Sequence, residues 1–179
     1  GSIKQEPAMT IDQREFRNAL GHFATGVAIV TTSVNGNRLG STISSFNSVS
    51  LSPPLVLFSL VRESLGFAQW KEASAFCIAV LGESQKDLSN RFAKAGTDKW
   101  EGLEIDVADN GSPIIGGAIA YFECEPYRYC DGGDHEIFVC RVTKCHLGSQ
   151  SESSLIFFAG KYRTLNSLEH TNQRYRTGQ

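Results

Sequence analysis

Two short apolar runs constrain the fold more than any other feature of the sequence. The run Leu55–Val61 (LVLFSLV) is apolar at every position except Ser59, and Phe76–Leu81 (FCIAVL) is apolar throughout. Runs of this length without a polar face are typical of strands that are buried on both sides. They predict a chain built on a β-rich core. The length of 179 residues suits one such domain, because domains commonly have about 100–200 residues.

Further strand signals extend this core along the chain. The stretch 27–34 (VAIVTTSV) is rich in β-branched residues, which favour strands. Asn35-Gly36 is a strong turn signal and predicts a hairpin that returns through Arg38–Ser45. Three more strands are predicted towards the C-terminus, at Ile119–Tyr129, Glu136–Leu147 and Leu155–Tyr162. About six strands with scattered helices predict a mainly β fold, a closed barrel with helices packed on its outside.

Three helices are predicted around this barrel. The first has capping-box spacing at Thr10 and Gln13, an apolar stripe facing inward, and a C-terminal stop at Gly26. A second, short helix is expected over 64–73, and a third has Ser84 as its N-cap. The stripe of the first helix follows helical spacing and comprises Phe16, Ala19, Leu20, Phe23 and Ala24.

The chain is predicted to form a single domain over residues 10–168. Residues 1–9 are expected to be disordered, and the first two, Gly1 and Ser2, resemble a cloning scar. Residues 96–118 are rich in Gly and Asp and are expected to be irregular. The polar tail 169–179 is expected to be mobile.

Composition and charge argue against several classes of protein. Hydrophobic residues make up 41% of the chain, enough to bury a core, so a disordered protein is not expected. The 17 basic and 19 acidic residues give a net charge of −2, which argues against nucleic-acid binding through a broad basic surface. No apolar run approaches the roughly 20 residues of a membrane helix, and the N-terminus lacks the apolar segment of a signal peptide.

Cysteine usage favours a reducing compartment. The five cysteines are an odd number and include no CxxC pair, so a disulfide framework is not expected and a cytoplasmic location is predicted. Cys140, Cys145 and His146 match no common zinc-ligand spacing. Alternating residues of one strand explain these three better, and no metal site is predicted.

The segment Gly40–Ser50 (GSTISSFNSVS) is the most informative for chemistry. More than half of its residues are Ser or Thr, and each buried hydroxyl needs a hydrogen-bond partner. Small hydroxyl side chains beside a glycine leave backbone N–H groups open to a phosphate or to the polar edge of a ring. A strand with one solvated polar face is the alternative, and composition alone leaves both interpretations open.

Two further segments are candidate ligand contacts. In Asp131–His135 (DGGDH), paired glycines permit a tight turn that presents His135 at a strand mouth, although an ordinary surface turn explains the pattern as well. In Phe158–Arg163 (FAGKYR), a glycine before a basic-aromatic patch would let a planar ligand lie against the backbone. A strand end with snorkelling Lys161 and Arg163 is the alternative. The chain has no GxGxxG, P-loop or GxSxG motif, which argues against Rossmann, P-loop and serine-hydrolase chemistry.

Taken in order, these segments resemble the short-chain flavin reductases, which have an FMN-binding split-barrel fold. Members of that family are the reductase components of two-component flavin-dependent monooxygenases. The resemblance covers about residues 12–165. The resemblance rests on the segments FRNALGHFATGVAIVTT, GSTISSFNSVSLSPPLVLFSL, FCIAVL, QKDLSNRFA, DKWEG, GGDHEIFVCRV and FFAGKYR. No one of these motifs is decisive, and their order and spacing together carry the resemblance.

The resemblance implies the residues of a flavin site. Flavin contacts fall on the hydroxyl-rich segment and on strand and helix positions after it, namely Arg38, Leu39, Gly40, Ser41, Thr42, Ser44, Ser45, Ser59, Leu60, Val61, Ser64, Leu65, Gly66, Arg91 and Phe92, with Lys99 near phosphate. His135 matches the histidine of the family's GDH motif, near the nicotinamide, and its expected catalytic part is binding and positioning. The segment that lines the nicotinamide-nucleotide side is matched by Gly160, Lys161, Tyr162 and Arg163. Leu65-Gly66 replaces a more polar pair of the family, which weakens the expectation of a phosphate contact there.

The resemblance also implies an NAD(P)H:flavin oxidoreductase that passes a hydride from NADH or NADPH to FMN or FAD. It further implies a homodimer and a separate oxygenase component that receives the reduced flavin. A non-catalytic flavin-binding module stays open as an alternative, as does a reductase of another acceptor such as an iron chelate or cobalamin. The residues decide neither the flavin nor the nicotinamide nucleotide, and they do not identify the oxygenase.

Overall fold

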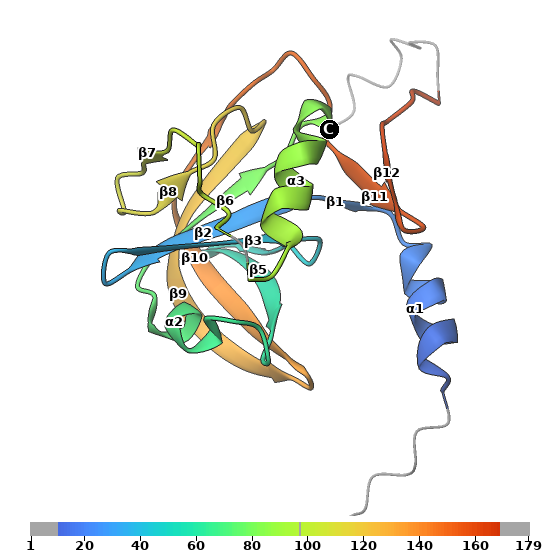
Figure 1. Cartoon of the computed structure of the whole chain (residues 1–179), viewed down its shortest axis with the longest axis horizontal. Coiled ribbons are helices and arrows are strands. Elements are labelled where there is room, and N and C mark those ends of the chain that lie inside the picture. The colour runs from blue at the N-terminus through green and yellow to red at the C-terminus, as the bar shows by residue number, and fades with distance from the viewer. Residues whose placement is uncertain (1–10, 97, 169–179) are drawn as a thin grey trace, which may run out of the picture.

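The chain folds as antiparallel strands with a few short helices around them (Figure 1). The computed structural model describes residues 11–96 and 98–168. The helices are α1 (Gln13–Gly21), α2 (Phe67–Glu72) and α3 (Lys86–Ala93), with a 3-10 helix, η1 (Glu83–Gln85), before α3. The strands are β1 (Thr25–Gly26), β2 (Ala28–Val34), β3 (Asn37–Ile43), β4 (Asn47–Leu51), β5 (Pro54–Val61), β6 (Phe76–Val80), β7 (Asp106–Val107), β8 (Pro113–Ile114), β9 (Ala120–Gly132), β10 (His135–Leu147), β11 (Ile156–Phe158) and β12 (Lys161–Arg163). The predicted termini, 1–9 and 169–179, lie outside the described residues.

Seven of the strands form one antiparallel sheet in the order β3-β2-β6-β9-β10-β5-β4. The two longest strands, β9 and β10, pair along most of their length and join its two halves. Among the described residues, β3 and β4 are the outer strands and do not pair with each other. The predicted mainly β architecture is therefore confirmed, but the ladder is not closed by hydrogen bonds as a complete barrel would be.

A smaller sheet, β1-β11-β12, supports α1. The N–H of Ala159 donates to the carbonyl of Gly21 at 2.7 Å, and the ring of His22 meets the ring of Phe158 edge to face at 5.9 Å. Figure 1 shows α1 beside this small sheet, away from the seven-stranded one. These contacts hold the helix at its C-terminal end.

The start, end and orientation of α1 differ from the sequence prediction. Asp12 is the N-cap, and its carboxylate accepts two backbone N–H bonds of the first turn, whereas Thr10 lies outside the described residues. The helix ends at Gly21, and the predicted stop, Gly26, lies in β1. The apolar stripe faces outward in the single chain, with exposed fractions of 52% for Phe16, 56% for Leu20 and 79% for Phe23. The predicted inward orientation is wrong because none of the described residues, 11–96 and 98–168, covers the stripe.

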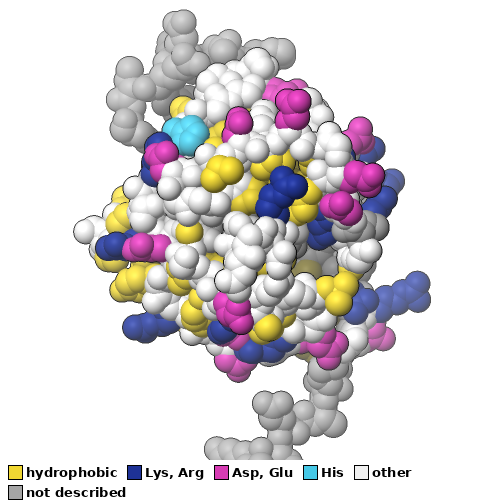
Figure 2. Space-filling view, turned by 60° about the vertical axis from the view of Figure 1, so that its left-hand side comes forward, with side chains coloured by type: hydrophobic (Ala, Val, Ile, Leu, Met, Phe, Trp, Pro, Cys, Tyr) yellow, Lys and Arg dark blue, Asp and Glu magenta, His cyan; other side chains and the backbone are white. Residues whose placement is uncertain are grey.

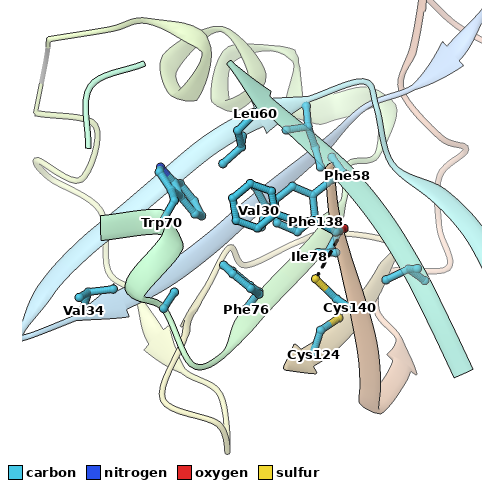
Figure 3. Packing of buried hydrophobic residues seen from close by; sticks show 14 residues of the cluster. Val30, Val34, Phe58, Leu60, Trp70, Phe76, Ile78, Cys124, Phe138 and Cys140 are labelled. Atoms are coloured by element: carbon cyan, nitrogen blue, oxygen red, sulfur yellow. Dashed lines mark hydrogen bonds between the residues drawn. The ribbon is translucent and has the colours of Figure 1, made fainter. Parts of the chain in front are cut away.

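The larger core cluster is built around stacked aromatic rings (Figure 3). The rings of Phe58 and Phe138 are parallel, with centroids 5.0 Å apart. Phe76 meets both of them edge to face, at 5.4 and 6.0 Å, and Trp70 of α2 packs on Phe76 at 6.2 Å. This cluster joins β5, β6 and β10 to α2, so the strand ends near α2 are held rigidly.

A second cluster covers the opposite face of β2 and β6. In β2, Val30 belongs to the first cluster and Ile29 to the second. Both faces of these strands are therefore buried, which confirms the prediction for the run Phe76–Leu81. The run Leu55–Val61 is buried on one face, through Val56, Phe58 and Leu60. Its other face is only partly covered, because Leu57 and Ser59 are half-buried and Val61 is 43% exposed, so the prediction of burial on both sides is wrong for most of this run.

The hairpin predicted at Asn35-Gly36 is confirmed. Both residues have positive φ, 51° and 80°, the backbone that a two-residue hairpin turn requires, and β2 and β3 pair directly across the turn. Within the predicted irregular segment 96–118, the described residues 96 and 98–118 are irregular apart from the two-residue strands β7 and β8.

Three other local predictions need correction. Ser84 lies within η1, and its hydroxyl donates to the carboxylate of Glu152 at 2.9 Å instead of capping a helix. The helix expected over 64–73 is shorter, because a hydrogen-bonded turn precedes Phe67. The strand expected over 155–162 is two strands, β11 and β12, separated by a turn.

Candidate functional site

One cleft gathers most of the residues predicted from the sequence. Its volume is about 750 Å³, within the range of ligand pockets. It lies between β3, the loop after β3, the end of β5, α2 and the loop after α3. The predicted residues that line it are Arg38, Leu39, Gly40, Ser41, Thr42, Ser44, Ser45, Ser59, Leu60, Val61, Ser64, Leu65, Gly66, Phe92, Lys99 and His135.

The hydroxyl groups of the cleft fall into two sets. Those of the first set are used within the protein: Thr42 donates to the carbonyl of Ser89 at 2.7 Å, Ser45 accepts from the backbone N–H of Ser59 at 2.9 Å, and Ser64 donates to the carbonyl of Val61 at 2.6 Å. In the part of the chain that the structure describes, the hydroxyls of Ser41, Ser44 and Ser59 have no protein partner. The second set is therefore available to a ligand.

One wall of the cleft is aromatic. Phe92 and Trp100 meet edge to face, with ring centroids 4.9 Å apart. Both press against Gly40, where a Cβ atom would lie 2.7 Å from a ring carbon of Phe92 and 3.0 Å from one of Trp100. The guanidinium of Arg38 lies 5.1 Å from the centroid of the Trp100 ring, a cation–π distance. This wall requires glycine at position 40.

Lys99 links β3 to α3 at this wall. Its ammonium donates to the carbonyls of Gly40 and Phe92, both at 3.0 Å. Burial lowers its pKa. An ammonium has three donors, so one N–H remains beyond these two bonds. The predicted phosphate contact of Lys99 stays a prediction and rests on that third donor.

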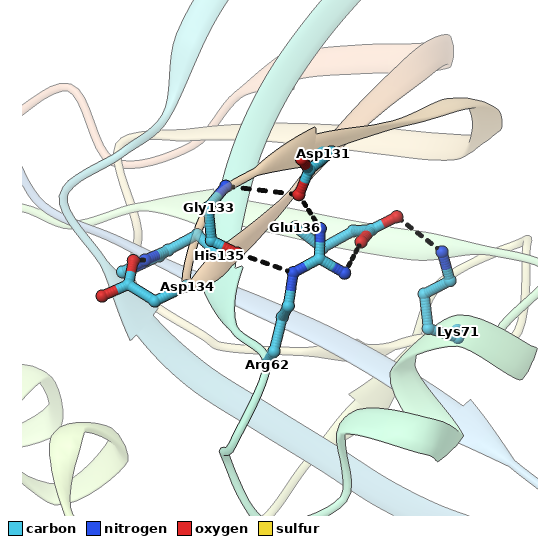
Figure 4. A network of polar contacts seen from close by, with 7 residues as sticks. All are labelled: Arg62, Lys71, Asp131, Gly133, Asp134, His135 and Glu136. Atoms are coloured by element: carbon cyan, nitrogen blue, oxygen red, sulfur yellow. Dashed lines mark hydrogen bonds and ion pairs between the residues drawn. The ribbon is translucent and has the colours of Figure 1, made fainter. Parts of the chain in front are cut away.

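His135 stands at the start of β10, opposite Val61 in the ladder. Its Nδ1 lies 2.7 Å from the carboxylate of Asp134 (Figure 4). This hydrogen bond is the main reason why the pKa of Asp134 is lowered. Because Asp134 occupies Nδ1, Nε2 is the ring nitrogen left for a ligand in the cleft.

Five predicted residues lie outside the cleft. Arg91 lines a smaller pocket on α3, and its guanidinium donates to the carbonyl of Glu101. The other four form the β11–β12 turn and β12, where the hydroxyl of Tyr162 bonds to Ser89 at 2.6 Å and to Asn90 at 3.0 Å. Tyr162 is thus bonded to α3, and the predicted nicotinamide contact of Gly160, Lys161, Tyr162 and Arg163 stays a prediction.

Sequence reasoning missed several residues that line the cleft. They come from the ends of β3 and α3, from α2 and from the loop after α3, and comprise Ile43, Gln69, Trp70, Ala93, Ala95, Gly96, Asp98 and Trp100. For Trp100 a signal was present, since it follows Lys99 in a basic-aromatic pair. The others carry no pattern that distinguishes a cleft residue from an ordinary helix or loop residue.

On the face in Figure 2, basic and acidic side chains are interspersed and hydrophobic ones form small, separate patches. Among residues 11–96 and 98–168, no three His, Cys, Asp or Glu side chains are grouped to hold a metal. No helix in the same ranges is both long and apolar enough to cross a membrane. Cys140 is buried and Cys145 exposed within β10, so the predicted strand alternation is confirmed.

Several known proteins with similar sequences are described as flavin reductases or as reductase subunits of monooxygenases. The sequence profile of the flavin reductase like domain matches residues 20–166. A flavin reductase of Pseudomonas putida is 39% identical over 153 residues, which are 85% of this chain and 89% of that protein. The reductase subunit of a flavin-dependent monooxygenase from Rhodococcus jostii is 38% identical over 155 residues, 87% of this chain and 79% of that protein.

A solved structure agrees with these sequences. An NADH:FAD oxidoreductase of Streptomyces globisporus, in complex with NAD and FAD fragments, superposes with a TM-score of 0.82 at 31% identity. The match covers 90% of this chain and 98% of that one. The open seven-stranded sheet therefore corresponds to the predicted split barrel in a single domain. The profile and the relatives, each spanning most of the chain, show that it belongs to the family of flavin reductase like domains.

Proposed function

We propose that the chain is an NAD(P)H:flavin oxidoreductase that supplies reduced flavin to a separate monooxygenase component. The observation that carries this proposal is one cleft that combines partner-free hydroxyls, an aromatic wall and His135. The names of the relatives support both parts, because one is a flavin reductase and another is a reductase subunit.

A flavin fits the chemistry of the cleft. The ring system has a polar edge of carbonyl and N–H groups, and the hydroxyls of Ser41, Ser44 and Ser59 can each donate to or accept from that edge. Its flat faces need apolar contacts, which Leu60 and Val61 supply at the end of β5. The same cleft therefore offers both kinds of surface that the ligand needs.

In this proposal the residues of the chain bind and orient the flavin and the nicotinamide and exclude water from between them. When bound, the flavin accepts a hydride from the reduced nicotinamide. The hydroxyls of the cleft fix the flavin ring system. His135 orients the nicotinamide ring through Nε2, while Asp134 holds Nδ1 of the histidine. Holding two reactants in contact removes much of the entropic barrier to their reaction. No side chain needs to act as an acid in the hydride step itself.

The experiment that tests this function is an assay of NADH and NADPH oxidation with FMN, FAD and riboflavin. Oxidation that requires both the protein and a flavin is the expected result, and the six combinations give both specificities. If flavin binds but no nicotinamide nucleotide is oxidised, the chain is a flavin-binding module instead. If oxidation begins only after an iron chelate or cobalamin is added, the acceptor differs from the proposed one.

The proposed assembly is a homodimer, and the exposed stripe of α1 is the surface that supports it. All five cysteines are free thiols, which supports a reducing compartment such as the cytoplasm. The reduced flavin is proposed to leave the cleft and reach the oxygenase component by itself.

Replacing Leu20 with aspartate should shift the protein from dimer towards monomer. A charge placed on an apolar interface is left without a partner and loses its hydration. Light scattering should give twice the chain mass of 19.6 kDa for the wild type and a lower mean mass for the variant. Val107→Asp is the control, because Val107 is similarly exposed but lies on β7. A wild-type mass of 19.6 kDa at micromolar concentration would contradict the homodimer.

Ser59→Ala should weaken flavin binding without destabilising the fold. Its hydroxyl has no protein partner, so the loss is one ligand hydrogen bond, about 0.5–1.5 kcal/mol. Ser45→Ala should instead lower the free energy of unfolding, because Ser45 is the acceptor for the backbone N–H of Ser59. Flavin fluorescence titration and urea unfolding of both variants measure the two effects. Equal flavin affinity in Ser59→Ala and wild type would remove this hydroxyl from the site.

A further inference from the structure

The turn that carries His135 is held by a single arginine from outside the cleft (Figure 4). Arg62 directly follows β5, which pairs with β10. Its backbone N–H donates to the carbonyl of Asp134 at 3.0 Å, and its Nε donates to the carbonyl of Gly133 at 3.0 Å. A terminal nitrogen of the guanidinium donates to the carboxylate of Asp131 at 2.6 Å.

The remaining guanidinium nitrogen binds a buried carboxylate. It lies 2.5 Å from one oxygen of Glu136, and the other oxygen is 2.7 Å from the ammonium of Lys71. Glu136 is only 7% exposed. Its pKa is lowered, chiefly by the hydrogen bond from Lys71 and further by the charge of Arg62. Since Glu136 follows His135 directly, Arg62 is bonded on both sides of the histidine.

An isolated ion pair at the surface would have little effect on structure. The arrangement at Arg62 differs because all three guanidinium nitrogens are used, and each is bonded to a different residue of the turn or of β10. Only a rigid planar fork makes such contacts at once, and a lysine ammonium does not reproduce them. The guanidinium therefore fixes the shape of the turn as well as its charge.

We propose that Arg62 is a positioning residue for the reaction: it fixes the turn 131–135 so that the ring of His135 stands where the nicotinamide binds. The inference rests on the proposed flavin reductase function. Arg62 does not line the cleft, and it acts through His135. A reacting group displaced by about 1 Å can cost on the order of 100-fold in rate, so loosening this turn lowers the rate even when His135 is present.

Two substitutions of Arg62 separate charge from geometry. Arg62→Lys keeps a cation beside Glu136 but loses the fork, and Arg62→Gln loses both. Both variants are expected to lower kcat/KM for NADH by about 10-fold, measured at saturating FMN. The dissociation constant for FMN should stay at the wild-type value, because the hydroxyls of the cleft are not attached to this turn.

The matched control is Arg141→Lys. Arg141 also lies on β10 and binds a carboxylate, that of Glu125, through Nε at 2.9 Å and a terminal nitrogen at 2.5 Å. That pair lies outside the cleft and bonds to no part of the turn. Arg141→Lys is expected to keep the wild-type kcat/KM for NADH.

Stability measurements distinguish positioning from a general structural role. Arg62→Lys should retain most of the free energy of unfolding, because the ion pair with Glu136 is kept, and still show the full kinetic loss. A wild-type kcat/KM in Arg62→Lys would overturn the inference. A kinetic loss accompanied by an equal loss of FMN affinity would overturn it too, since the whole cleft would then be disturbed.

Hydrogen exchange tests the anchoring without NADH or flavin. Backbone amides of residues 132–136 should exchange faster in Arg62→Gln than in the wild type and Arg141→Lys. Unchanged exchange overturns the inference, whatever the activity. If the wild type oxidises no NADH, the proposed function fails. Faster exchange in Arg62→Gln would then show that Arg62 holds the turn, but without a role in this reaction. Should Arg62→Gln not fold, Asp131→Asn removes the charge from one of these bonds at an 84% exposed side chain and should show a smaller change in the same direction.

Discussion

Replacing His135 with alanine is expected to lower kcat/KM for NADH by about 10-fold or more. The ring lines the cleft from the first residue of β10, and the bond to Asp134 leaves Nε2 for the nicotinamide nucleotide. Removing it takes away the contact that orients the hydride donor. The measurement is a steady-state assay at saturating flavin with NADH varied.

Flavin binding is the internal control for this variant. The hydroxyls that we assign to the flavin come from β3, the loop after it and β5, so His135→Ala should leave the flavin dissociation constant nearly unchanged. Weaker flavin binding with unchanged NADH kinetics would place His135 on the flavin side. A wild-type kcat/KM would exclude the positioning role altogether.

The pH dependence of this orientation follows from Asp134. The hydrogen bond from His135 lowers the pKa of Asp134, so the carboxylate remains charged until the pH falls below its ordinary range. The contact between the two side chains should therefore persist across neutral pH and be lost only in acid. Asp134→Asn, which keeps an oxygen acceptor but removes the charge, should retain more activity than His135→Ala.

The sequence predicted well those features that short stretches determine by themselves. Asn35-Gly36 defines a hairpin because few other residue pairs adopt its backbone, and Phe76–Leu81 defines a buried strand because no polar face is present. The stripe of α1 shows the limit of such patterns. Helical periodicity shows that one face is apolar, but what covers that face depends on tertiary and quaternary structure.

The candidate site was predictable in part for a similar reason. The hydroxyl segment is unusual in composition, and the resemblance to a family assigns it to the same site as Ser59 and His135. These residues do line one cleft, and their contacts with flavin and nicotinamide stay predictions. The sequence did not show which hydroxyls are already bonded, because the partners of Thr42 and Ser45 lie far along the chain. Arg62 was missed since its proposed role depends on three contacts with a distant turn and one with Glu136 of β10.

Substituting Gly40 with alanine should disrupt the aromatic wall of the cleft. The new Cβ would lie 2.7 Å from Phe92 and 3.0 Å from Trp100, distances that force something to move. Phe92 is fully buried, so its ring has no solvent to turn into. Overpacking of this kind typically costs about 1–3 kcal/mol of stability. Flavin affinity should fall as well, because Gly40 and both rings line the cleft.

Gly26→Ala is the control for Gly40→Ala, since a Cβ at Gly26 would meet only the Ser154 hydroxyl, at an ordinary 3.8 Å. Urea unfolding and flavin titration of both variants measure the effect. Combining Gly40→Ala with Phe92→Leu should recover part of the loss, because the smaller side chain makes room and residues in contact are not additive. If Gly40→Ala were as stable as Gly26→Ala, or if Phe92→Leu added its full cost to the double variant, the close contact would not determine this wall. Recovery of flavin affinity in the double variant would show that the shape of the wall, and not one ring atom, governs binding.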